Sequence, residues 1–306
     1  MQTLSCPAWL YWDPPLEVFT VPWIDRPVVW YGILFVSGFI LGYFLFVHIL
    51  ANYFIKNEST SRTQFLDASS AKRTAYLLAD RLLRFIVIGT LVGARLGHVL
   101  FYDWELFIHH PLEIFKVWKG GLASHGGVVG VLIGLYLYHL SIRKQFPGFS
   151  FLRLLDFVAI PSALAACFIR LGNFMNQEIV GTPSQVPWAI VFGNAADGSL
   201  PIPRHAVQLY EAAAYFVIFL ILFGLWKTKK EEHKPGLFIG LLFVLIFSAR
   251  FILEFWKVHQ DSIFEFSSLQ AGQLLSIPFI LIGFVLIYRS QKAQNNHSLP
   301  EKNHEN

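Results

Sequence analysis

Three arginines stand inside apolar stretches of this sequence, where a charged side chain is costly. Arg95, Arg170 and Arg250 each lie in a run that is long and hydrophobic enough to cross a membrane. A guanidinium near the centre of a membrane-spanning helix costs about 2.5–3.5 kcal/mol, so each arginine needs a partner or a task. Guanidinium groups stay charged and bind phosphate through two parallel N–H groups. Arg170 and Arg250 together therefore suit a phospholipid headgroup.

Other polar residues stand near the arginines or at the ends of the same apolar runs. They are Tyr31, His125, Asn173, Asn176, Glu178 and Glu254. A histidine with an ordinary pKa of about 6.5 can accept a proton from an attacking nucleophile. The glycines of the stretch 120–127 around His125 allow a substrate to approach the backbone closely. We expect no metal or cofactor, because His-Glu-x-x-His and Cys-x-x-Cys motifs are absent from the sequence.

Each of these residues also has a structural interpretation. Arg250 and Glu254, one helical turn apart, could simply neutralise each other. A lone His125 beside glycines could be a hydrogen-bonded structural residue, and Tyr31 could be an interfacial aromatic anchor. Arg170 is harder to explain in this way, because no acidic residue lies within one turn of it on its own helix.

Two further features favour packing over chemistry. Arg95, nearer the middle of the membrane than the other two arginines, is expected to have a structural partner. Glycines at four-residue spacing, such as Gly126, Gly130 and Gly134, indicate close packing between helices.

Composition sets the class of fold that must position these side chains. Of the 306 residues, 55% are hydrophobic and 14% charged, whereas a soluble protein has about 25% charged residues. The apolar residues form long continuous runs, which excludes a transmembrane β-barrel, and nothing indicates a nucleic-acid partner. We expect an all-α polytopic membrane protein with about seven transmembrane helices. These spans are 28–52, 84–102, 122–142, 154–175, 206–226, 236–256 and 270–288.

Lysines and arginines predict the orientation of these helices. Four segments on one side of the membrane carry 6, 3, 4 and 3 of them, and the other side holds only five. These segments are 53–84, 143–153, 227–235 and 289–306. Because cytoplasmic loops are rich in lysine and arginine, the N-terminus is expected outside and the C-terminus in the cytoplasm. Residues 1–289 then form a single membrane domain, and 290–306 a cytoplasmic tail.

The longest outer connection, residues 176–205, contains four prolines and three glycines. Such a density of proline and glycine predicts a small irregular cap of turns and short strands, with 188–192 as the best strand candidate. The predicted orientation places the polar candidates at the outer ends of their helices, at one depth. We therefore expect a single site at the outer membrane surface.

Several motifs, in this order along nearly the whole chain, resemble the prolipoprotein diacylglyceryl transferase family. They are Trp30-Tyr31-Gly32, the stretch 120–127, the run from Arg170 to Glu178 with Gly181, the stretch 203–211, Arg250 to Glu254, and the stretch 272–278. The Arg-x-Gly-Asn-Phe-x-Asn-x-Glu run is specific to that family. Two positions depart from the pattern: Ile246 stands where some relatives have tyrosine, and Lys257 replaces a frequent arginine. Lys257 keeps the charge but loses the bidentate fork.

The resemblance implies an enzyme of the bacterial inner membrane that moves the diacylglyceryl group of phosphatidylglycerol onto the lipobox cysteine of a prolipoprotein. It implies His125, Arg170, Arg250 and Glu254 as catalytic residues, with His125 as the base that takes the thiol proton. Glu254 or Glu178 could take this proton instead, or the thiol could ionise in the field of the arginines. Substrate-binding residues would be Tyr31, Arg170, Asn173, Asn176, Glu178, Gly181 and Arg250. The chemistry of the residues alone also fits another phospholipid headgroup enzyme, such as a phosphatase. A transporter is the third alternative, although repeated halves are not evident in the sequence.

Overall fold

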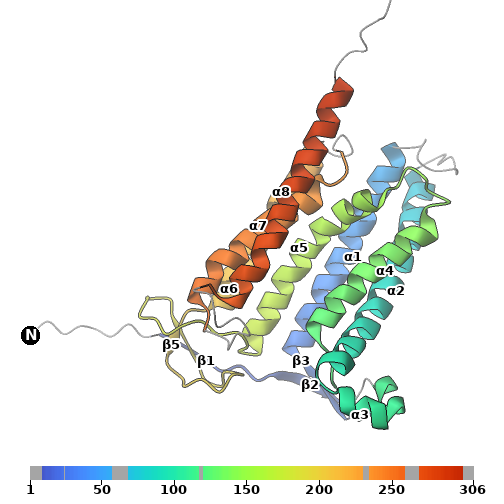
Figure 1. Cartoon of the computed structure of the whole chain (residues 1–306). Helices are drawn as coiled ribbons and strands as arrows, with labels where there is room; N and C mark the ends of the chain where they lie inside the picture. Colours follow the sequence, from blue (N-terminus) through green and yellow to red (C-terminus); the bar gives the residue numbers. More distant parts are fainter. Residues whose placement is uncertain are drawn as a thin grey trace, which may run out of the picture. The chain divides into compact units, whose positions relative to one another are not determined.

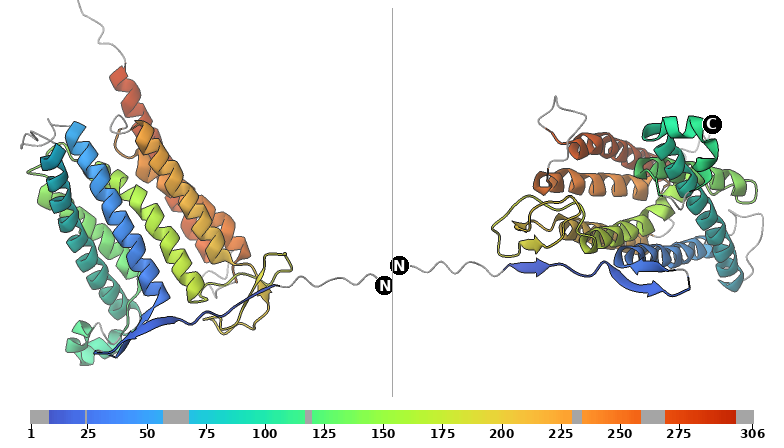
Figure 2. Two further views of the ribbon diagram at one scale, coloured as in Figure 1. Left: turned by 180° about the vertical axis from the view of Figure 1, so that it is seen from behind. Right: turned by 90° about the horizontal axis from the view of Figure 1, so that it is seen from below.

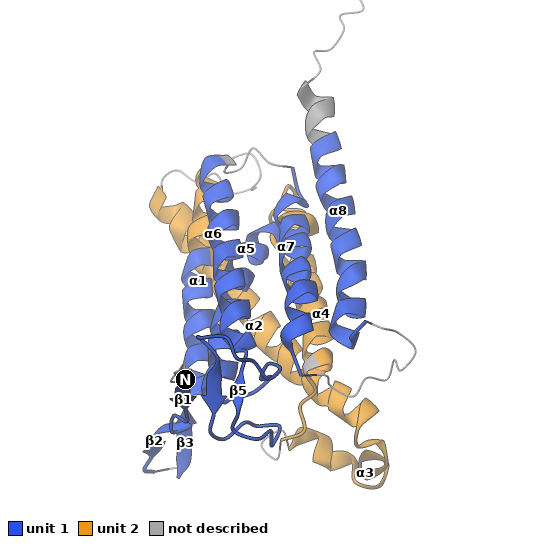
Figure 3. Ribbon diagram, turned by 90° about the vertical axis from the view of Figure 1, so that its left-hand side faces the viewer, with its two compact units in different colours: residues 1–45, 155–306 blue, residues 46–154 orange. Residues whose placement is uncertain are grey.

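The computed structural model describes residues 9–23, 25–56, 68–116, 120–229, 234–258 and 269–298. The chain divides into two compact units, which Figure 3 shows in different colours. The first unit consists of Met1–Leu45 and Leu155–Asn306, and the second of Phe46–Leu154. The boundary between them runs through two helices, α1 (Trp30–Lys56) and α5 (Phe151–Met175).

Helices dominate the first unit. Besides parts of α1 and α5, it contains α6 (Val207–Lys229), α7 (Leu237–Leu253) and α8 (Ala271–Ser298). A short 3₁₀ helix, η5 (Glu254–Trp256), follows α7 directly. α7 lies along α8 and against α6 (Figures 1 and 2). The long apolar runs explain these helices, because only internal hydrogen bonding satisfies the backbone in lipid.

An aspartate on α5 supplies the N-terminal cap of α7. The buried carboxylate of Asp156 accepts hydrogen bonds from the backbone N–H groups of Gly236 (2.8 Å) and Ile239 (2.9 Å). The first N–H groups of a helix have no partner within the helix, and an anion there also suits the positive end of the helix dipole. Asp156 thus ties the start of α7 to α5.

A small sheet and a hairpin complete the first unit. β1 (Leu10–Trp12) pairs in parallel with β4 (Ile190–Phe192), which pairs in antiparallel fashion with β5 (Pro203–Arg204). β2 (Glu17–Val21) and β3 (Arg26–Val29) form a separate antiparallel hairpin, and β3 leads directly into α1.

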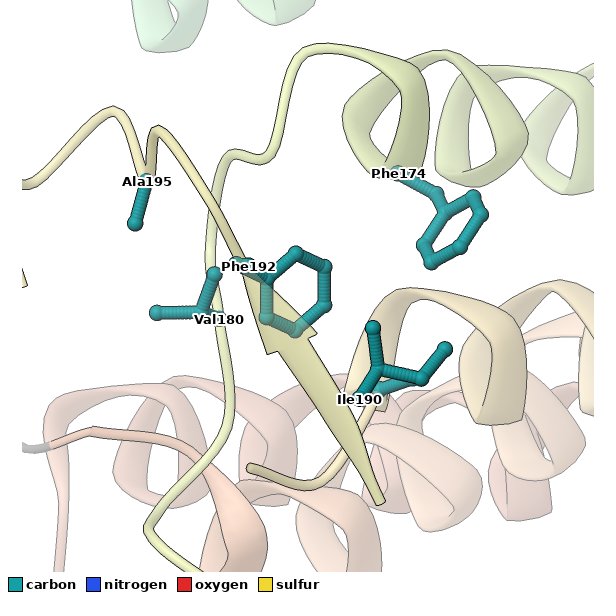
Figure 4. Packing of buried hydrophobic residues seen from close by; sticks show 6 residues of the cluster. Phe174, Val180, Ile190, Phe192 and Ala195 are labelled. Atoms are coloured by element: carbon teal, nitrogen blue, oxygen red, sulfur yellow. The ribbon is translucent and has the colours of Figure 1, made fainter. Parts of the chain in front are cut away.

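Apolar side chains give the segment after α5 its own core. Six buried residues form this cluster: Phe174, Val180, Ile190, Phe192, Ala195 and Ala206. Figure 4 labels all of them except Ala206. Trp12 of β1 packs against the cluster and stacks on Phe174, with ring centroids 4.6 Å apart. The N-terminal strand therefore forms part of the same small body as residues 176–205.

The second unit is built on two helices, α2 (Ala68–Phe101) and α4 (Ser124–Ile142). Their contact is made of glycines. A Cβ added at Gly93 would lie 2.7 Å from the Cα of Gly130, and one added at Gly97 would lie 2.8 Å from the Cα of Gly126. The backbones thus approach more closely than any side chain would permit. Between the two helices along the chain come α3 (Trp104–His109) and the 3₁₀ helix η2 (Pro111–Phe115).

The helical class expected from the sequence is confirmed, and the chain is a multi-pass membrane protein. Six helices of the described residues are long and apolar enough to cross a membrane. They are Trp30–Lys56, His125–Ile142, Phe151–Met175, Val207–Thr228, Leu237–Trp256 and Ala271–Lys292. The seventh expected span, 84–102, falls on α2, whose first half carries several charged residues. The count of seven spans and their orientation stay predictions.

Two finer expectations can be compared with the strands. The best strand candidate, 188–192, corresponds to β4, which is shorter and begins at Ile190. The strands β1, β2 and β3 near the N-terminus were not expected. The predicted tail, 290–306, lies partly in α8 and partly outside the described residues.

Candidate functional site

Arg170 finds its acidic partner on another helix. Its Nε lies 3.0 Å from Oε2 of Glu211 on α6, an ion pair whose angle falls short of a hydrogen bond. Glu211 is fully buried, and 14% of the Arg170 side chain is exposed. Nη1 of Arg170 donates a hydrogen bond to Oδ1 of Asn173 (3.1 Å). The guanidinium is therefore fixed along one edge by groups of α5 and α6.

Glu178 binds the two asparagines that the sequence placed beside Arg170. Its Oε2 accepts a hydrogen bond from Asn173 Nδ2 (2.7 Å), and its Oε1 accepts one from Asn176 Nδ2 (3.0 Å). Arg170, Asn173, Asn176 and Glu178 thus form one continuous network at the end of α5. Glu178 is thus linked to Arg170 through the side chain of Asn173.

The turn after α5 is held in an unfavourable backbone conformation. Gln177 has φ of 53° and Ile179 has φ of 57°, and the left-handed region is rare for a β-branched residue such as isoleucine. Such strain costs about 1–3 kcal/mol and persists only where the surroundings enforce it. Gln208 does so in part, because its side chain donates a 2.7 Å hydrogen bond to the carbonyl of Glu178. The strained turn directs the Glu178 carboxylate back toward the asparagines.

Lys257 bridges two carboxylates at the end of α7. Its Nζ lies 3.0 Å from Oε1 of Glu211 and 3.0 Å from Oε2 of Glu254, and only 7% of its side chain is exposed. Glu254 therefore pairs with Lys257, and the expected pair of Arg250 with Glu254 is not formed. Glu211 lies between Arg170 and Lys257, so an alternating chain of charges joins α5, α6 and η5.

Arg250 stands one turn before Glu254 on α7 and is partly buried. Among the residues that the structure describes, no side chain forms an ion pair or a hydrogen bond with its guanidinium. The neutralisation of Arg250 by Glu254, which the sequence left open, is thus wrong. A partly exposed guanidinium that pairs with none of the described side chains is a candidate to bind an anionic ligand.

Two further predicted residues pack close to this network. The ring of Tyr31 lies against Gly172, where an added Cβ would be 2.8 Å from the ring. Gly181 donates a hydrogen bond to the carbonyl of His205 (3.0 Å) and forms an isolated β-bridge with Lys257. Glycine is required at position 181 because an added Cβ would collide with that carbonyl.

A ring cluster next to the small sheet contains an additional histidine. Nδ1 of His205 lies 3.2 Å from the hydroxyl of Tyr210, which accepts a 2.9 Å hydrogen bond from Nε1 of Trp188. Burial lowers the pKa of His205 below its ordinary value. His205 is therefore neutral at pH 7 and serves this cluster as a polar but uncharged group.

His125, the candidate base, belongs to the second unit. It is exposed at the start of α4, and its ring centroid lies 5.2 Å from that of Phe101 and 5.9 Å from that of Tyr102, both at the end of α2. The expected meeting of His125 with the arginines of the first unit stays a prediction.

The second unit also carries an apolar groove of about 800 Å³ along α2 and α4. His125 lies at its end, and branched side chains such as Ile88, Val92 and Val129 line it. A groove with this lining suits an aliphatic chain better than a polar molecule.

In the described part of the chain, no group of three or more histidine, cysteine, aspartate or glutamate side chains could hold a metal ion.

Reasoning from the sequence missed Glu211 as the partner of Arg170 and the bridging role of Lys257. One signal was present: Glu211 stands in a predicted helix with an apolar surrounding, where a carboxylate needs a cation. Arg95 was placed nearer mid-membrane. In the structure, the residue before it, Ala94, accepts a hydrogen bond from the backbone of Ala123, so Arg95 is level with the start of α4.

The fold and the site together define a class: a multi-pass membrane protein with a cluster of arginine, lysine and amide side chains at the ends of its helices. Comparison with known proteins then identifies the family. A family model described as prolipoprotein diacylglyceryl transferase matches residues 19–289, and the chain belongs to this family.

Curated relatives agree with this assignment over nearly their full length. A protein of Protochlamydia amoebophila is 49% identical, with 94% of this chain and 96% of the relative covered. A protein of Tolumonas auensis is 44% identical, with 87% of this chain and 93% of the relative covered. A protein of Chloroherpeton thalassium is 37% identical, with 93% of this chain and 96% of the relative covered. All three are named phosphatidylglycerol-prolipoprotein diacylglyceryl transferase. The resemblance noted in the sequence is thereby confirmed.

Proposed function

We propose that this protein transfers the diacylglyceryl group of phosphatidylglycerol to the lipobox cysteine of prolipoproteins in the bacterial inner membrane. The observation that carries this proposal is its membership of a family whose model matches residues 19–289 and whose curated members bear that activity in their names. The partly buried Arg250, without a protein partner among the described residues, supplies a cation for an anionic headgroup.

The reaction is an attack of the cysteine sulfur on the glyceryl carbon that bears the phosphate. A carbon–sulfur bond forms, the carbon–oxygen bond to phosphate breaks, and glycerol 1-phosphate leaves. A thiol has a pKa of about 8.5, so a base must take its proton at neutral pH. We assign that role to His125, because a neutral imidazole can accept a proton from an attacking nucleophile. The leaving phosphate must gain negative charge away from bulk water, where fixed cations are most effective.

We assign the headgroup clamp to Arg170 and Arg250. Arg170 is preorganised, because its Nε pairs with Glu211 and its Nη1 donates to Asn173. Asn176, Glu178 and Tyr31 would orient headgroup oxygens directly or through Asn173. Glu254 would act through Lys257, and Gly181 would keep the adjoining backbone close. The apolar groove beside His125 would hold an acyl chain.

The orientation that follows from the loop charges places the site at the outer surface, with the N-terminus outside and seven crossings. Residues 176–205 would then form a cap above the outer ends of the helices. This arrangement gives the enzyme access to precursors that have crossed the membrane.

The test uses the purified full chain in detergent with phosphatidylglycerol and a synthetic lipobox peptide, followed by mass spectrometry of the peptide. We expect a mass gain of one diacylglyceryl unit. Free diacylglycerol with an unmodified peptide would instead identify a headgroup phosphatase. If neither substrate reacts, the transporter alternative would be favoured. Each of these two results contradicts the proposal.

The clamp is tested in the same assay with Arg170→Lys, which keeps the charge but loses the fork. We expect a loss of more than tenfold in kcat/KM, which corresponds to about 1.4 kcal/mol or more of transition-state stabilisation. Arg73→Lys, an exposed position on α2, serves as the matched control. Unchanged activity of Arg170→Lys would show that no bidentate contact is made there.

A further inference from the structure

Arg95, whose buried guanidinium the proposed function does not use, makes an unusual set of contacts. Only 7% of the residue is exposed. Its Nε donates to the carbonyl of Ile114 (2.9 Å), and its Nη2 donates to the carbonyl of Glu113 (2.6 Å). Nη1 donates to the carbonyls of Gly120 (2.8 Å) and Gly121 (3.1 Å). All three guanidinium nitrogens thus bind backbone carbonyls.

Two of these carbonyls belong to the 3₁₀ helix η2, and the other two belong to Gly120 and Gly121, which precede α4 without regular structure. Gly120 and Gly121 have φ of 86° and 73°, values that glycine adopts readily. An added Cβ at Gly121 would lie 2.7 Å from Nη1 of Arg95 and 2.6 Å from Nε2 of His98. The two glycines are therefore folded directly onto Arg95.

No carboxylate pairs with Arg95 in the described part of the chain. An arginine kept to neutralise an acid would bind that acid. Here the charge is balanced by carbonyl dipoles and by the ring of Phe107, whose centroid lies 5.1 Å from Cζ. These contacts fix the backbone around Arg95, because five N–H groups in a planar fork can bind several carbonyls at once.

The fixed segment leads directly to His125. Gly121 is four residues before it, and the backbone N–H of Ala123 donates to the carbonyl of Ala94 (2.9 Å). The glycine contact between α2 and α4 holds the helix itself, and Arg95 holds the chain that enters it. We propose that Arg95 is a positioning residue, which sets the orientation of His125 during diacylglyceryl transfer. This inference rests on the proposed function of His125 as the base.

The test is a double-mutant cycle of Arg95→Lys and His125→Asn, with kcat and KM measured for phosphatidylglycerol and the lipobox peptide. Lysine keeps the charge, but its single nitrogen cannot replace three. We expect Arg95→Lys alone to lower kcat at least tenfold and to change the KM for phosphatidylglycerol less than twofold. In the His125→Asn background we expect a further loss of less than threefold, because both residues act through the same step.

A structural readout separates this inference from the base assignment. Nitroxide labels at the exposed positions Leu91 on α2 and Leu112 on η2 report the order of the segment by pulsed electron paramagnetic resonance. We expect a narrow distance distribution in the protein with Arg95 and a broad one in Arg95→Lys, and no change with Arg73→Lys.

Each other outcome has a definite meaning. Equal losses from Arg95→Lys in both backgrounds, or an unchanged distance distribution, would overturn the positioning role while leaving His125 as the base. Full activity of His125→Asn alone would instead overturn the base assignment. In that case the label distances would still show whether Arg95 orders the segment, but the positioning of a catalytic His125 would be refuted.

Discussion

Lys257 determines which side chains its neighbouring carboxylates pair with. By binding Glu211 and Glu254 at 3.0 Å each, it engages the carboxylate that would otherwise be the nearest acid to Arg250 on the same helix. An arginine that is paired with a glutamate is a poor ligand for phosphate, because the headgroup must displace the carboxylate. In the proposed mechanism, Lys257 would therefore support the clamp without touching the substrate.

Replacing Lys257 by methionine should release Glu254 to pair with Arg250. We expect the KM for phosphatidylglycerol to rise at least tenfold, together with a loss of stability, because the buried Glu211 would keep Arg170 but lose the second cation that it binds. The control is Lys257→Arg, which restores the charge and should retain activity. Steady-state kinetics in detergent measures the KM of both variants. A KM that stays within twofold in a folded Lys257→Met protein would contradict this account.

His205 gives a prediction about pH. Burial lowers its pKa in the folded protein, so the unfolded chain, with a histidine pKa of about 6.5, takes up the proton first. Stability should therefore fall as pH decreases below about 6.5. Thermal unfolding at pH 7.5 and 5.5 should show a smaller difference for His205→Gln than for the unaltered protein. An equal pH dependence in both would mean that His205 does not contribute.

At the scale of elements, the contact between α2 and α4 depends on glycine. A Cβ at Gly130 would collide with the backbone of Gly89. The same substitution at Gly224 of α6 meets no atom within 4 Å. A methyl group therefore fits at Gly224 but not at Gly130.

We expect Gly130→Ala to lower the thermal unfolding midpoint clearly, at a cost of about 1–3 kcal/mol for overpacking. Gly224→Ala should leave the midpoint unchanged or raise it slightly, because alanine favours the helix. Circular dichroism in detergent measures both. Equal midpoints for the two variants would show that the glycine contact is not needed.

The helices were the predictable elements, since runs of apolar residues determine them with little help from the rest of the chain. The strands β1 to β3 were not predictable in this way. β1 has three residues, and its partner β4 lies about 180 positions later, so no local pattern announces the pairing. The cap of α7 by Asp156 is equally non-local, because it joins positions 80 and 83 residues apart.

The sequence named candidate site residues but not the pairs that they form. The polar residues of the run from Arg170 to Glu178 form one network in the structure, and their part in a functional site stays a prediction. The partners of Arg170 and Glu254 came from other elements, Glu211 and Lys257, which spacing along one helix could not reveal. Contacts across helices depend on how the helices pack, and the sequence alone does not specify that packing.

At the scale of the whole molecule, diacylglyceryl transfer would require residues from both units. The proposed mechanism needs His125 of the second unit and the arginines of the first to act on the same lipid. Sulfur attack and phosphate departure occur at one carbon, so the base and the clamp must both lie within a few ångströms of it.

Photolabelling measures this requirement most directly. Phosphatidylglycerol that carries a diazirine on its headgroup glycerol is bound to the full chain, irradiated, and mapped by peptide mass spectrometry. We predict adducts in both stretches, 120–127 and 170–178, and a parallel loss of both when unlabelled phosphatidylglycerol competes. Adducts confined to one stretch would contradict a common site for His125 and Arg170.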